Sequence, residues 1–137
     1  MTEALWLGLI ISFILLSVFA LNCGNGKKQL NDISTSQADS IITSNLPNSQ
    51  FMILDVRTLD EFNTGHLAGA KNIDIRSADF ELRIDSLPKS SKYLVYCRTG
   101  HRSANAMNIM KNKGFVEVYN MVGGITKWIE EKRATVQ

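Results

Sequence analysis

The stretch that decides the fold is Tyr93–Ser103, which reads YLVYCRTGHRS. Its first residues form a short apolar run of the kind expected for a buried strand. From Ser103 to Lys113 the apolar residues recur at helical spacing, which predicts a helix. Cys97 therefore stands where a buried strand ends and a glycine-containing loop leads into a helix.

The residues that follow Cys97 suit a reactive thiol. Backbone N–H groups of a tight loop and of a first helical turn converge on one point and bind negative charge there. Arg98 and Arg102 add positive charge, and His101 can add more. A lone cysteine at the end of an apolar strand is usually inert, but these polar neighbours would then each need a partner. The pattern favours a thiolate with a pKa below about 8.5, which is an activated nucleophile.

The other segments extend the same alternation of strands and helices. Phe51–Val56 (FMILDV) is too apolar to be half exposed and too short for a helix, which predicts a central strand buried on both faces. Further strands are expected at Lys71–Ile75 and Val116–Asn120, and helices or helical turns at Ser34–Asn45, Leu59–Asn63, Ser77–Leu87 and Ile125–Lys132. The pattern predicts an α/β fold with a central parallel sheet flanked by helices on both faces.

Composition excludes several classes of function. The net charge of the 137 residues is +2, and Lys27–Lys28 is the longest basic run, so no nucleic-acid partner is expected. Cys23 and Cys97 lie far apart in different surroundings, which argues against a disulfide framework. No CxxC or HExxH pattern is present, so no metal site is predicted.

The amino-terminal part predicts contact with a membrane. Residues 4–21 carry no charge, and their length approaches the ~20 residues that a helix needs to cross a bilayer. Residues 22–29 (NCGNGKKQ) then resemble a short flexible linker. We therefore expect a hydrophobic membrane segment and linker over residues 1–26 and a folded domain over residues 27–137.

Three interpretations of this segment stay open. Lys27 and Lys28 follow the apolar run, which favours a retained anchor with the folded domain in the cytoplasm. The sequence ALNCGNG resembles a lipobox, in which Cys23 would be lipidated and the domain would face the periplasm. A cleaved secretory signal fits less well, because Glu3 stands where lysine or arginine is usual.

Two polar residues end the strand over Phe51–Val56. The carboxyl ends of parallel strands share one edge of a sheet, so Asp55 and Arg57 are expected at the same edge as Cys97. His66 stands between glycines in a turn, where a structural hydrogen bond is more common than a catalytic role.

Three segments carry a resemblance to a known family. They are LDVRTLDEFNTGHLAGAKNIDI (Leu54–Ile75), YCRTGHRSANAMNIMKNKGF (Tyr96–Phe115) and MVGGITKW (Met121–Trp128). In order and spacing they resemble the three motifs of a single-domain rhodanese, over roughly residues 33–131. The resemblance implies a three-layer domain and a sulfurtransferase without a cofactor. Its cysteine would take sulfur from a donor such as thiosulfate, hold it as a persulfide, and pass it to a thiol or cyanide.

The resemblance also implies roles for individual residues. Cys97 would be the nucleophile. The substrate-binding loop would comprise Arg98, Thr99, Gly100, His101, Arg102 and Ser103. Supports of the loop would be Asp55, Arg57 and Glu61, while Gly123, Gly124 and Trp128 would be packing residues.

Two questions about this site stay open in the sequence. Arg102 could bind the substrate anion or form an ion pair with Glu61 or Asp55. It is the fifth residue after Cys97, whereas related phosphatases and arsenate reductases have the arginine at the sixth position, so the shorter loop resembles the sulfur-transferring type. The alternative from another class is a rhodanese-like module that binds a partner or carries sulfur without turnover.

Overall fold

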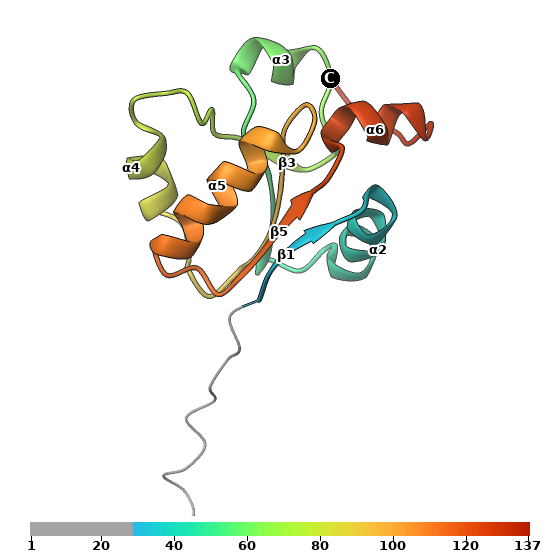
Figure 1. Cartoon of the computed structure of the whole chain (residues 1–137). Coiled ribbons are helices and arrows are strands. Elements are labelled where there is room, and N and C mark those ends of the chain that lie inside the picture. Colours follow the sequence, from blue (N-terminus) through green and yellow to red (C-terminus); the bar gives the residue numbers. More distant parts are fainter. Residues whose placement is uncertain (1–28) are drawn as a thin grey trace, which may run out of the picture.

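A computed structural model describes residues 29–137, which fold as strands and helices in near-regular alternation (Figure 1). The strands are β1 (Gln29–Ile33), β2 (Phe51–Asp55), β3 (Ala70–Asn72), β4 (Lys92–Tyr96) and β5 (Glu117–Met121). The helices are α2 (Thr35–Asn45), α3 (Leu59–Asn63), α4 (Phe80–Asp85), α5 (His101–Asn112) and α6 (Gly124–Glu130).

The strands form one sheet in the order β1-β5-β4-β2-β3, and every neighbouring pair is parallel. The register places Ile53 of β2 beside Leu94 of β4, and Tyr93 of β4 beside Val118 of β5. Because all pairs are parallel, the carboxyl ends of the strands share one edge. Gln29 begins β1 at the opposite edge.

Two apolar cores lie on the two faces of the sheet. On one face Val95 of β4 packs with Ala106 and Met110 of α5. On the other, Leu94 packs with residues that include Ala38 of α2. Figure 1 shows the matching layers, with α4 and α5 on one side of the sheet and α2 and α6 on the other. The predicted parallel sheet covered by helices on both faces is confirmed.

The main differences between the predicted elements and the structure concern β1, α5, β3 and α4. Strand β1 was not expected, because QLNDI carries three polar residues and its beginning resembled a linker. As an edge strand it pairs only with β5. Helix α5 begins at His101 and not at Ser103, because the preceding glycine ends the loop in a left-handed conformation. Strand β3 and helix α4 are both shorter than predicted.

The predicted membrane segment at residues 4–21 and the lipidation candidate Cys23 lie outside the described residues. Within residues 29–137, no helix combines the length and the apolar character needed to cross a bilayer. The predictions for the amino-terminal part therefore stay predictions.

Candidate active site

The cysteine lies at the end of β4, beneath the loop that leads into α5. Cys97 is buried, with 1% of its surface exposed. The loop closes at Gly100, whose φ of 96° is left-handed. A Cβ atom at this position would lie 3.2 Å from the carbonyl oxygen of Met121 and from the backbone nitrogen of Gly123. Only glycine fits this turn without displacing the neighbouring backbone.

The loop and the first helical turn donate hydrogen bonds to the thiol. The N–H of Gly100 donates to Cys97 Sγ at 3.1 Å, and the hydroxyl of Ser103 does so at 3.5 Å. Burial raises the pKa of Cys97, but hydrogen bonds from the hydroxyl and N–H of Ser103 and from the N–H groups of Thr99 and Gly100 outweigh it and lower the pKa. The predicted thiolate is therefore stabilised mainly by hydrogen-bond donors of the loop.

Helix α6 holds the outer side of the loop. The N–H of Ile125 donates to the carbonyl of Cys97 at 2.9 Å, and the N–H of Thr126 donates to the carbonyl of Arg98 at 3.0 Å. Gly124 makes this approach close, because a Cβ atom there would lie 2.3 Å from the Cys97 carbonyl oxygen. The carbonyl groups of Cys97 and Arg98 therefore accept hydrogen bonds from α6, while the N–H of Gly100 donates to the sulfur of Cys97.

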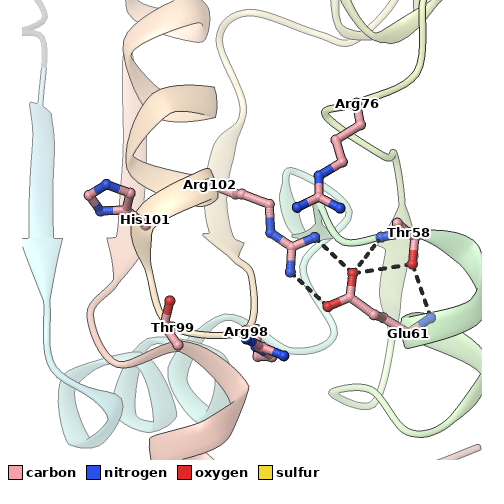
Figure 2. Close-up of a pocket in the computed structure, with 7 residues that line it drawn as sticks. All are labelled: Thr58, Glu61, Arg76, Arg98, Thr99, His101 and Arg102. Carbon is pink, nitrogen blue, oxygen red and sulfur yellow. Dashed lines mark hydrogen bonds and ion pairs between the residues drawn. The ribbon is translucent and has the colours of Figure 1, made fainter.

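Arg102 forms a bidentate ion pair with Glu61 of α3 (Figure 2). Its Nη1 and Nη2 atoms each donate to one carboxylate oxygen at 2.7 Å. The same carboxylate accepts from the N–H and hydroxyl of Thr58, both at 3.1 Å. Of the partners that the sequence left open for Arg102, Glu61 is the one the structure provides. Hydrogen bonds from Arg102 lower the pKa of Glu61 from its ordinary 4.5 to about 2.

Glu61→Gln is expected to lower the free energy of unfolding at neutral pH by about 1 kcal/mol, since the ion pair is only partly buried. The folded pKa lies below the ordinary value, so the carboxylate stabilises the fold fully above about pH 5 and loses this effect as the pH falls toward 2. Urea unfolding of both proteins between pH 7 and pH 3 measures the difference, which should shrink with acid. A pH-independent difference would contradict the assignment, and Glu130→Gln on the exposed face of α6 is the control.

The predicted supports Asp55 and Arg57 pair with each other. The Asp55 carboxylate is fully buried and accepts from Arg57 Nη2 at 2.6 Å, while the same Nη2 donates to the carbonyl of Gly65 at 2.7 Å. The pair thus fastens the end of β2 to the turn after α3. His66 in that turn contacts the carbonyl of Phe62 through Nδ1 at 3.1 Å, a structural hydrogen bond as predicted.

A pocket of about 460 Å³ opens over the loop (Figure 2). Its lining residues are Thr58, Glu61, Arg76, Arg98, Thr99, His101 and Arg102. Among the predicted substrate-binding residues, Gly100 and Ser103 face the sulfur and do not line this pocket. Thr58 and Arg76 were not predicted. Thr58 could have been found from its capping pattern with Glu61, whereas nothing in the sequence marks Arg76.

Within residues 29–137 no cluster of His, Cys, Asp and Glu could hold a metal ion.

The fold and the loop together define an α/β domain in which hydrogen-bond donors lower the pKa of a buried cysteine. Cys97 itself does not line the basic pocket, but its neighbours Arg98 and Thr99 do. The sequence model of one family, described as the rhodanese-like domain, matches residues 36–131. The chain belongs to this family, and the predicted resemblance is confirmed.

Relatives of this chain include sulfurtransferases and sulfur carriers. The thiosulfate sulfurtransferase GlpE of Stutzerimonas stutzeri is 34% identical over 82 residues, which cover 59% of this chain and 72% of GlpE. The putative sulfur carrier protein YrkF of Bacillus subtilis is 34% identical over 76 residues, which cover 56% of this chain. The matched region covers 59% of the length of the uncharacterized protein YqhL of Bacillus subtilis and 40% of the length of YrkF. The chain thus spans less than two thirds of these two relatives.

A solved structure shows the same fold. The rhodanese-related protein from Thermoplasma volcanium superposes with a TM-score of 0.66 at 30% sequence identity. The superposition covers 77% of this chain and 97% of that protein.

Proposed function

We propose that this protein is a sulfurtransferase that moves sulfane sulfur from a donor such as thiosulfate to a thiol or cyanide acceptor through a persulfide on Cys97. The observation that carries the proposal is the set of donors around the sulfur, led by the Gly100 N–H at 3.1 Å from Sγ. These donors lower the pKa of the thiol despite its burial. A nucleophile formed in this way requires no separate general base.

The first half-reaction uses the charge of the pocket. The thiolate of Cys97 attacks the outer sulfur of thiosulfate, the S–S bond of the donor breaks, and its electron pair leaves with sulfite. The donor is a dianion, and Arg98 and Arg102 line the pocket that it would enter. The persulfide left on Cys97 is itself an anion, so the N–H donors of the loop stabilise substrate and intermediate alike.

Thiosulfate treatment of the full-length protein in detergent is expected to add the mass of one sulfur atom. Intact-mass spectrometry measures the gain, and digestion assigns it to the peptide that contains Cys97. The chain has two cysteines, so Cys23→Ala is the matched control and should keep the gain. A folded protein that gains no sulfur from thiosulfate or from a persulfide donor, or that gains it on Cys23, would contradict the proposal.

A sulfur carrier without turnover is the second candidate, and the match to the putative sulfur carrier YrkF favours it. Such a protein would also form a persulfide on Cys97. It would differ in the second half-reaction, because small thiols and cyanide would then fail to discharge the persulfide. Measuring thiocyanate or hydropersulfide release over several turnovers separates the two candidates.

A further inference from the structure

The pocket holds more positive charge than the loop motif accounts for. Three arginines line it, and Arg102 is neutralised by Glu61. The guanidinium groups of Arg76 and Arg98 have no hydrogen-bond or ion-pair partner among residues 29–137, and both residues are exposed. The pocket is therefore a cationic site with two unpaired guanidinium groups.

Arg76 comes from a different part of the fold than the loop arginines. It lies in the connection between β3 and α4, where its N–H donates to Asp74 Oδ1 at 2.9 Å and fixes the turn. Figure 2 shows its side chain extending into the pocket toward the guanidinium of Arg102. Because Arg102 is already paired with Glu61 and Arg76 is not paired, the guanidinium of Arg76 is available to an anionic ligand that enters the pocket.

The pocket is also larger than the donor requires. Pockets that hold small organic molecules have volumes of about 300–1,000 Å³, and this one has about 460 Å³. Thiosulfate is a small inorganic ion that needs the loop end of the pocket, next to Arg98. Arg76 lies outside the cysteine loop, in the connection between β3 and α4, so it is available to a second substrate.

We propose that Arg76 binds a carboxylate group of the sulfur acceptor, and that the preferred acceptor is a small thiol that carries carboxylates. This inference rests on the proposed function. The acceptor thiolate attacks the outer sulfur of the Cys97 persulfide, the persulfide S–S bond breaks, and its electron pair returns to Cys97 Sγ as the thiolate. The acceptor leaves as its hydropersulfide anion. Arg76 acts as a positioning residue that selects the acceptor by charge.

Competition between two acceptors tests this selection. The full-length protein is loaded with sulfur, and discharge of its persulfide is measured with mercaptosuccinate, which has two carboxylates, and with the neutral 2-mercaptoethanol. Arg76→Gln is expected to lower the ratio of the two rate constants about fivefold, the upper range for one solvent-exposed charge pair. Arg83→Gln on the adjacent helix α4, outside the pocket, should leave the ratio as in the wild type. An unchanged ratio for Arg76→Gln overturns the proposal.

A binding measurement separates failure of this proposal from failure of the proposed function. In the unreactive Cys97→Ser background, the affinity for S-methyl mercaptosuccinate is measured by calorimetry with and without Arg76→Gln. A fivefold weaker affinity in the double variant supports recognition by Arg76 even if no sulfur is transferred. Equal affinities, or no binding to either protein, overturn it.

Discussion

Replacing Cys97 by serine is expected to abolish sulfur transfer while the domain stays folded. The hydroxyl of serine does not ionise near neutral pH and forms no persulfide, so the donors that surround the sulfur would have no nucleophile to activate. Turnover from thiosulfate to cyanide should fall by at least about 10³-fold, as expected for loss of a nucleophile. Thiocyanate formation measures the effect.

The folded state of this variant needs its own measurement. Serine is close to cysteine in size. Cys97 is buried beside hydrogen-bond donors of Gly100 and Ser103, and a serine hydroxyl can accept hydrogen bonds from the same donors. Circular dichroism and urea unfolding should therefore resemble those of the wild type, and Cys97→Ala serves as a second variant. Substantial turnover in either folded variant would show that the chemistry lies elsewhere. Cys23→Ser is the control that should retain turnover.

Replacing Gly124 by alanine is expected to destabilise the domain by about 3 kcal/mol, from overpacking and from a left-handed backbone, and to reduce sulfur transfer. The added Cβ would lie 2.3 Å from the carbonyl oxygen of Cys97 and 2.5 Å from that of Arg98. Both are backbone atoms, so either the loop or α6 must move. That movement would break the hydrogen bonds from Ile125 and Thr126 that hold the loop. Urea unfolding measures the stability, and thiocyanate formation measures the activity of the folded fraction.

Gly69→Ala is the control that separates the effect of a steric clash from the effect of a left-handed backbone conformation. Gly124 and Gly69 both have a left-handed φ, of +57° and +77°, but a Cβ atom at Gly69 would meet nothing within 4 Å. Its replacement should cost only the about 1–2 kcal/mol of an L-residue in this conformation, and sulfur transfer should persist. An equal loss of stability and activity in the two variants would contradict the role given to Gly124.

Local sequence pattern was sufficient for the central strands and for the cysteine loop. Strands β2 and β4 are apolar runs buried between two layers of helices, and such runs have few other interpretations. Strand β5 is buried over four of its five residues, although it contains Glu117 and Asn120. Strand β1 was missed because it lies at the edge of the sheet, where Asn31 and Asp32 are exposed. Polar residues are compatible with an edge strand, so its sequence resembles a linker.

The site shows a similar division between local and tertiary information. The loop residues and Glu61 lie in recognisable motifs, but only the fold decides that Arg102 pairs with Glu61 while Asp55 pairs with Arg57. Arg76 could not be predicted, because it follows no periodic pattern and reaches the pocket only through the path of the chain between β3 and α4. Contacts between distant segments are set by tertiary packing, which a single motif does not encode.

The position of β1 determines through which end the domain can be attached to a surface without covering the pocket. The chain enters the sheet at Gln29, on the edge opposite to Cys97, whereas Val136 near the other end pairs with His66, beside α3 (Figure 1). An attachment at the start of β1 would therefore lie at the edge of the sheet opposite to the pocket and leave the mouth of the pocket free. Attachment through the carboxyl end would place the support beside the mouth. For capture on a chip or fusion to a second domain, the topology favours attachment ahead of Gln29, because that edge of the sheet is the one farther from the pocket.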